Sequence, residues 1–176
     1  MQFTNAALAL ALSVAVAGAA AAAAPQPVRP APQTLYSGRW YEIALTPNKL
    51  QKNCEAPTND FSGRTASGFS VVQTCHEGSV NGPKHTLRAH GHVLPASNNT
   101  KLELGFFGGL VSKQYWILDH ASNDVWAIMS TADGRYVWLL SRQPSLDASV
   151  RATALARLQS LGFNLTRLAF PEQAPQ

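Results

Sequence analysis

Four histidines, His76, His85, His90 and His92, are the residues whose type and spacing most readily suggest chemistry. His90 and His92 are two positions apart, so on a β-strand both side chains point to the same face, and His76 and His85 could lie near them. Imidazole nitrogens on one face could bind a metal ion or a tetrapyrrole. No third carboxylate or cysteine ligand is fixed beside them. We therefore expect a solvated histidine face and no metal or cofactor, and a metal or tetrapyrrole site at His90 and His92 is the alternative.

The two cysteines, Cys54 and Cys75, offer either a disulfide or a reactive thiol. They form no CxxC motif, and two ligands alone make no zinc site. In an antiparallel hairpin, paired residues share one midpoint, and the midpoint of Cys54 and Cys75 falls within the turn-rich stretch 62–68 (SGRTASG). The sequence therefore predicts a Cys54–Cys75 disulfide across a hairpin.

Signs of catalysis are sparse. The sequence contains no G-x-S-x-G nucleophile motif, and no Ser/His/Asp arrangement can be inferred from the spacing. Glu42 is a carboxylate that strand alternation places on the inner face beside Trp40, where we expect it to receive hydrogen bonds at the base of the fold. We expect no catalytic residues and no enzyme.

The N-terminal residues 6–24 are an uncharged, alanine-rich stretch followed by a proline-rich run. This pattern predicts a signal peptide over residues 1–24, cleaved between 19 and 24, and a Pro-rich linker over 25–33. A membrane anchor is the alternative, although alanine is only mildly apolar. With no cysteine near the cleavage region to carry a lipid, the expected location is periplasmic or secreted.

The net charge of +4 comes from 14 basic and 10 acidic residues. The basic residues are scattered, with no run of them and no aromatic residues interleaved. This distribution argues against nucleic acid as a partner and permits weak contact with an anionic membrane surface.

Short apolar-polar runs separated by turn residues predict an all-β protein. Asp133-Gly134, between two apolar runs, is the strongest hairpin signal. An amphipathic helix follows, with Ser145 as the expected N-cap and Gly162 just past its end, and residues 164–170 could add an edge strand. Closure of eight strands into an up-and-down barrel would remove all sheet edges. The expected strands cover residues 39–46, 56–62, 68–74, 86–93, 101–107, 115–119, 125–130 and 136–141.

Three motifs occur in the order and spacing of one family. "GRWYEIALTP" (38–47), "YWILDH" with "VWAIM" (115–129) and "YVWLLSRQP" (136–144) resemble the conserved regions of lipocalins, and most closely the bacterial lipocalin and apolipoprotein D branch. The resemblance covers residues 34–173. It implies an eight-stranded antiparallel barrel with one C-terminal helix packed outside. It also implies structural roles for Gly38, Trp40 and Arg142, because in this family the tryptophan plugs the closed end of the barrel and the arginine stacks over it.

The resemblance further implies a small hydrophobic ligand in the barrel, of the fatty acid or lysophospholipid class, bound for transport, storage or envelope maintenance. In the strand 101–107, Leu102, Leu104 and Phe106 alternate with Lys101, Glu103 and Gly105, so the apolar set should face inward. Family position places six further residues on the inner face: Tyr115, Ile117, Ala127, Met129, Tyr136 and Trp138. Alternation with Ala127 and Met129 then places Trp126 on the outer face. Some lipocalins are isomerases that use a free cysteine thiolate, which is the enzyme alternative. The expected ligand-binding residues are Leu102, Leu104, Phe106, Tyr115, Ile117, Met129, Tyr136 and Trp138.

Overall fold

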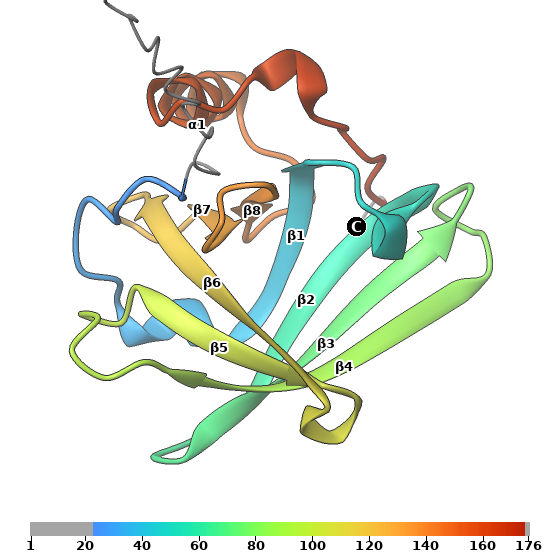
Figure 1. Cartoon of the computed structure of the whole chain (residues 1–176). Coiled ribbons are helices and arrows are strands. Elements are labelled where there is room, and N and C mark those ends of the chain that lie inside the picture. The colour runs from blue at the N-terminus through green and yellow to red at the C-terminus, as the bar shows by residue number, and fades with distance from the viewer. Residues whose placement is uncertain (1–22, 175–176) are drawn as a thin grey trace, which may run out of the picture.

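Eight antiparallel strands form a closed barrel in a computed structural model that describes residues 23–174 (Figure 1). Each strand pairs with the next along the chain, and the last strand pairs with the first. The predicted fold class, an eight-stranded up-and-down barrel with one external helix, is confirmed. The strands are β1 (Gly38–Leu45), β2 (Cys54–Thr65), β3 (Gly68–Glu77), β4 (Lys84–Val93), β5 (Lys101–Phe106), β6 (Val111–His120), β7 (Trp126–Thr131) and β8 (Val137–Ser141).

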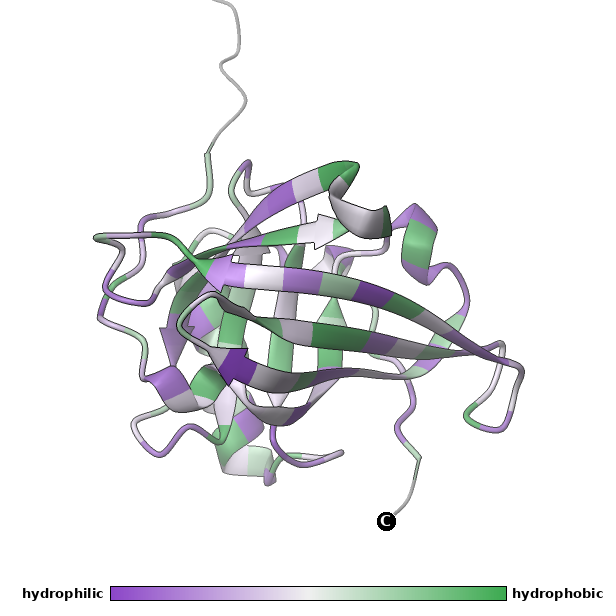
Figure 2. Ribbon diagram, turned by 90° about the horizontal axis from the view of Figure 1, so that it is seen from below, coloured by the Kyte–Doolittle hydropathy of each residue, from purple (hydrophilic) through white to green (hydrophobic). Residues whose placement is uncertain are grey.

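Alternation of side chains along the strands divides the apolar residues into two layers, and the ribbon colours in Figure 2 alternate accordingly. The inner cluster fills the barrel and includes Trp40, Leu102 and Trp138. The outer cluster lies between the barrel wall and the helix and includes Trp126 and Leu139. Strands β7 and β8 are buried throughout because both of their faces are covered.

Helix α1 (Ala148–Ser160) packs on the outside of the barrel over β7 and β8 (Figure 1). Ala154 and Leu158 face the outer cluster and are fully buried. Gly162 follows the helix with φ of +92°, as its predicted C-terminal position requires. The predicted N-cap at Ser145 is wrong. The helix begins after Asp147, because Leu146 packs against the outer cluster before the first helical turn.

The predicted edge strand at residues 164–170 is also wrong. Its central residues form a short 3-10 helix, η4 (Leu165–Arg167), with its N-terminus capped by the side chain of Asn164. Only Ala169 pairs with the sheet, through an isolated bridge to Leu45. The tail then passes the end of β1 and reaches β2, where the Glu172 carbonyl accepts a hydrogen bond from Ala56 N–H.

The predicted disulfide between Cys54 and Cys75 is present, with a Cα–Cα distance of 5.4 Å. The register used to predict it is wrong, because Cys54 pairs directly with Glu77. The β2–β3 ladder shifts between Glu55 and Thr58, where Ala56 adopts a positive φ of 46°. The bridge therefore joins diagonal neighbours next to a bulge, and the hairpin turns after Thr65, within the predicted stretch.

The N-terminal residues 24–31 lie along the barrel. The backbone N–H groups of Ala24, Val28 and Ala31 donate to carbonyls of Ala132, Leu118 and Asn98. The predicted signal peptide falls mainly on residues 1–22, outside the described part of the chain, and its cleavage and the Pro-rich linker stay predictions. Among residues 23–174, no helix combines the length and apolar character needed to cross a membrane.

Candidate functional site

One end of the barrel is closed by Trp40, which is 1% exposed on β1. Arg142, directly after β8, lies with its guanidinium carbon 3.7 Å from the centroid of the Trp40 ring. The same guanidinium donates to the carbonyls of Thr34, Ser37 and Arg39. A planar cation over an indole face gains cation–π and dispersion energy, so the pair joins the N-terminal segment to the end of β8. Gly38, with φ of +68°, provides the turn that the entry to β1 requires.

An aromatic layer supports this closed end. The short 3-10 helix η1 (Gln33–Tyr36) places Tyr36 inside the barrel, where its ring stacks on Phe69 with centroids 5.3 Å apart and contacts Phe61. The Tyr36 hydroxyl donates to the carbonyl of Asn99. Burial raises the pKa of Tyr36 well above its usual range. Aromatic side chains fill this end of the barrel, so the route to the interior lies at the other end.

An internal cavity of about 70 Å³ lies toward that other end. One wall is apolar and comes from β3 to β8. Five of the predicted ligand-binding residues line it: Leu104, Phe106, Tyr115, Met129 and Trp138. Val71, Leu87 and Ala89 complete this wall.

The structure places the other three predicted residues elsewhere. Leu102 and Ile117 are buried in the inner cluster together with Trp40 but do not line the cavity. Tyr136 lies at the barrel rim and packs against the inner cluster from there. A ligand-binding role for all eight residues stays a prediction.

The opposite wall of the cavity is polar and is centred on Glu42, which is 1% exposed. Glu42 Oε1 accepts from Asn59 Nδ2 at 2.7 Å and from Gln73 Nε2 at 2.8 Å, and Oε2 accepts from Gln51 Nε2. Burial raises the pKa of Glu42, and the three amide hydrogen bonds offset only part of that effect. Burial, and then the nearby Glu42 charge, raise the pKa of Tyr115 to about 12.

Glu42 therefore faces inward and receives hydrogen bonds, as the alternation of β1 suggests. It lines the cavity, however, and not the packed base of the barrel.

The short 3-10 helix η2 (Lys49–Gln51) covers the mouth of the cavity. The Gln51 side chain turns inward, donates to Glu42 and accepts from Trp138 Nε1 at 3.1 Å. Asn48 caps η2 by accepting from the backbone N–H groups of Leu50 and Gln51. Leu50 lines the cavity and is 73% exposed, so the cover is thin at this point.

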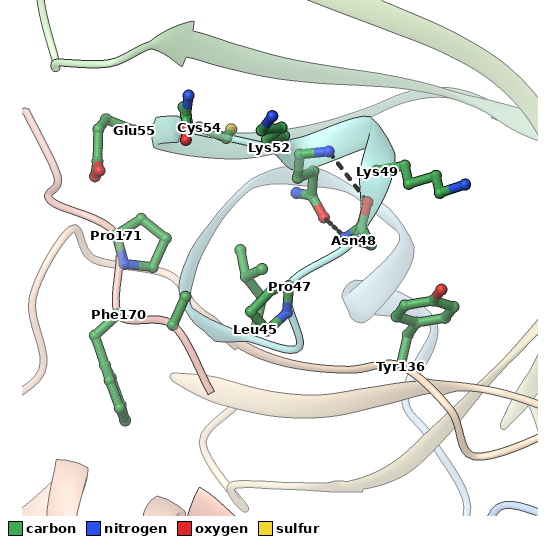
Figure 3. A pocket seen from close by; sticks show the side chains of 13 residues that line it. Leu45, Pro47, Asn48, Lys49, Lys52, Cys54, Glu55, Tyr136, Phe170 and Pro171 are labelled. Atoms are coloured by element: carbon green, nitrogen blue, oxygen red, sulfur yellow. Dashed lines mark hydrogen bonds between the residues drawn. The ribbon is translucent and has the colours of Figure 1, made fainter. Parts of the chain in front are cut away.

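A second hollow, the rim pocket, has a volume of about 510 Å³ and shares Asn48 and Gln51 with the internal cavity. In Figure 3, Tyr136 lies on one side of it, and Phe170 and Pro171 of the C-terminal tail lie on the other. The segment around η2 therefore separates the small cavity from a larger pocket at the rim.

Sequence reasoning missed Gln51, Asn59 and Gln73. The inner faces of β2 and β3 could not be assigned from the sequence, because polar residues occupy both faces of these strands. Direct pairing of Asn59 with Gln73 in the observed register brings both amides to Glu42. Gln51 lies in a connection that carries no strand or helix signal.

The histidine alternative finds little support in the geometry. His90 and His92 are exposed on the outer face of β4, and His90 Nδ1 lies 3.2 Å from Ser70 Oγ. Within residues 23–174, no three His, Cys, Asp or Glu side chains are grouped so that they could hold a metal ion. Both cysteines are in the disulfide, so neither is a free thiolate for the isomerase alternative.

Comparison with known proteins places these features in a family. The family model described as "Lipocalin-like domain" matches residues 34–173. Outer membrane lipoprotein Blc of Vibrio cholerae is 23% identical over 138 residues, which cover 78% of this chain and 80% of that protein. Apolipoprotein D of Mus musculus is 26% identical over 146 residues, covering 79% and 75% of the two chains. Insecticyanin of the tobacco hornworm Manduca sexta shares the fold, with a TM-score of 0.69, 18% identity and coverage of 87% of each chain.

Proposed function

Because this chain belongs to the lipocalin family, in the branch of bacterial Blc lipoproteins and apolipoprotein D, we propose that its barrel cavity holds a single-chain lipid. The observation that carries the proposal is the two-sided cavity in a barrel closed at one end. An apolar, partly aromatic wall faces a few convergent polar groups, which is the usual composition of a small-molecule site. The proposed ligand class is fatty acid or lysophospholipid, and the proposed role is lipid transport, storage or envelope maintenance.

The volume of the cavity defines how such a ligand would fit. Pockets for drug-sized ligands have about 300–1,000 Å³, whereas the closed cavity has about 70 Å³. This space suits a head group or the end of a chain. Binding of a whole lipid therefore requires displacement of η2, which would join the cavity to the rim pocket of about 510 Å³. Two side-chain hydrogen bonds join η2 to the barrel wall, from Gln51 to Glu42 and from Trp138 to Gln51, and this movement would break both.

The proposed location is periplasmic or secreted. The related Blc proteins are outer membrane lipoproteins by name, which supports a place in the cell envelope. Two features support weak contact with an anionic membrane surface. The first is the scattered basic surface. The second is a group of exposed apolar residues at the β5–β6 turn, on the same end of the barrel as η2: Phe107, Leu110 and Val111.

Two tryptophans on opposite faces of the barrel wall test the proposal. Trp138 lines the cavity, and Trp126 packs in the outer cluster. We expect Trp138→Ala to weaken binding of a fluorescent single-chain lipid with an uncharged head by about 1–3 kcal/mol, because a large apolar contact is lost. Trp126→Ala should cost stability and leave the affinity of the folded protein nearly unchanged. Fluorescence titrations of both variants give the answer.

Trp138→Phe separates two contributions of Trp138. It keeps an aromatic wall but removes the hydrogen bond to Gln51 that helps to hold η2 in place. Its affinity should stay close to that of the wild type. Weaker binding by Trp126→Ala with unchanged binding by Trp138→Ala would show that the ligand is not in the barrel.

A further inference from the structure

The internal cavity contains an acidic side chain, Glu42, without a positive partner. Among the described residues that line it, Glu42 is the only acid, and none is Lys, Arg or His. Its three hydrogen-bond donors, on Gln51, Asn59 and Gln73, are neutral amides. A buried carboxylate is costly unless it is paired or fully hydrogen-bonded, so an acid at this place is a strong candidate for contact with a ligand.

One oxygen of Glu42 can accept a further hydrogen bond from a ligand. An ionised carboxylate has about four acceptor positions. Asn59 and Gln73 use both positions of Oε1, whereas only Gln51 donates to Oε2. Oε2 therefore retains capacity for one further donor.

The donor already on Oε2 belongs to the part of the chain that covers the mouth. Gln51 comes from η2, whereas Asn59 and Gln73 are on strands of the barrel wall. In the opening proposed above, η2 would carry Gln51 away from Oε2, whereas Asn59 and Gln73 would remain on Oε1. Displacement of η2 would therefore both admit a ligand and leave Glu42 Oε2 free to accept a hydrogen bond from that ligand.

We propose that Glu42 is the head-group site of the cavity and receives the protonated amine of a single-chain amphiphile. The ammonium takes the place of the Gln51 amide at Oε2, and the alkyl chain lies along the apolar wall of Leu104, Phe106 and Met129. A charged donor on a carboxylate makes a stronger hydrogen bond than a neutral amide. A free carboxylate head would meet Glu42 with no cation to separate the two charges. This inference rests on the proposed function and, of its two ligand classes, disfavours a fatty acid with a free carboxylate and favours a lysophospholipid whose head group carries an amine.

Matched twelve-carbon probes test the head-group preference. Dodecylammonium, dodecanol and dodecanoate are each used, below their micelle concentrations, to displace an uncharged fluorescent probe from the whole protein at pH 7. We expect dodecylammonium to bind about tenfold or more tighter than dodecanol, and dodecanoate to bind most weakly. Dodecyltrimethylammonium keeps the charge but has no N–H donor, and should bind more weakly than dodecylammonium.

Glu42→Gln identifies the residue responsible. It removes the charge at nearly constant size and should reduce the preference for dodecylammonium over dodecanol to about twofold or less. Glu103→Gln on β5 makes the same charge change away from the cavity and should keep the wild-type preference. If Glu42→Gln does not fold, the comparison of dodecylammonium with dodecyltrimethylammonium on the wild type decides the matter alone.

The possible outcomes are distinguishable. If neither the uncharged fluorescent probe nor any of the four twelve-carbon probes binds, the proposed function itself is overturned. Equal binding of all heads, or tightest binding of dodecanoate, would overturn the role of Glu42 and leave lipid binding in place. A preference for ammonium that Glu103→Gln abolishes as fully as Glu42→Gln would show a long-range effect of net charge and no head-group site.

Discussion

Glu42 and Asp119 are both nearly inaccessible carboxylates, with 1% and 3% of their surfaces exposed, but their surroundings differ in charge. Asp119, on β6, lies on the outside of the barrel wall beneath α1. Its Oδ1 accepts from Arg29 Nε at 2.7 Å, and its Oδ2 accepts from Arg157 Nε at 2.6 Å. Glu42, inside the barrel, has amide donors only.

The two environments shift acidity in opposite directions. Burial by itself would raise the pKa of Asp119, but hydrogen bonds from Arg29, Arg157 and the His120 backbone outweigh it and lower the pKa. At Glu42, burial dominates and raises the pKa. Asp119 connects three segments, namely β6, α1 and the N-terminal run, so its charge is satisfied by the fold itself. Glu42 has no cation beside it and faces a cavity, where a ligand can act on it.

The largest expected effect is that of Asp119→Asn. It removes the negative charge that two arginines share and replaces one of the two acceptor oxygens by an amide donor, and it should lower the free energy of unfolding by about 2–4 kcal/mol. Chemical denaturation at pH 7 measures the change. Asp60→Asn is the matched control, because Asp60 pairs with Arg39 on the exposed barrel surface and should cost no more than about 1 kcal/mol. Equal losses in the two variants would contradict the anchoring role of Asp119.

A smaller effect is expected from removal of one arginine at a time. Arg157→Gln detaches α1 from Asp119 but leaves Arg29 in place, so the loss should be about 1–2 kcal/mol. Arg29→Gln should cost less, because the Arg29 side chain is more exposed, at 45% against 34%. Hydrogen exchange of the α1 amides should increase in Arg157→Gln alone. Faster exchange of α1 in Arg29→Gln would show that the two arginines do not act separately.

The smallest effect on stability is expected from Glu42→Gln, and its sign depends on pH. A carboxyl whose pKa is raised by folding stabilises the fold below its unfolded pKa of about 4.3, and this contribution is lost as pH rises through the folded pKa. Wild type should therefore lose stability relative to Glu42→Gln as pH rises above about 4. At pH 8 the variant should be within about 1 kcal/mol of wild type or more stable.

Asp119 should show the reverse dependence on pH. Its lowered pKa gives stability that is present above its unfolded pKa of about 3.9 and is lost as pH falls through the folded value. The deficit of Asp119→Asn should therefore shrink in strong acid. Parallel pH curves for both variants, measured by denaturation from about pH 3 to pH 8, would contradict the difference between the two carboxylates.

Much of the fold could be predicted because its signals are local. Alternation along 101–107 places Leu102, Leu104 and Phe106 inside, as the inner cluster shows. The family resemblance, combined with alternation, places Trp138 inside and Trp126 outside, as the two apolar clusters show. The predicted disulfide was confirmed although its register was wrong, because diagonal neighbours in a hairpin are also close enough to bridge. The helix start and the C-terminal strand were wrong, because packing of Leu146 and the single Leu45–Ala169 bridge override local preference.

The sequence by itself determined the barrel, the inner faces of strands such as β5 and β8, the external helix and, through its resemblance to a family, the pair Trp40 and Arg142. Only the tertiary structure decided which polar groups meet. Glu42 accepts hydrogen bonds from amide side chains of η2, β2 and β3. Asp119 binds two arginines that are 90 and 38 residues away in the chain. Alternation sets the face on which a side chain lies. Its neighbours across the sheet depend on the register of the strands, which the β2 bulge shifts. They also depend on segments that pack over the barrel from outside. Contacts of this kind depend on the whole fold, because no local pattern specifies them.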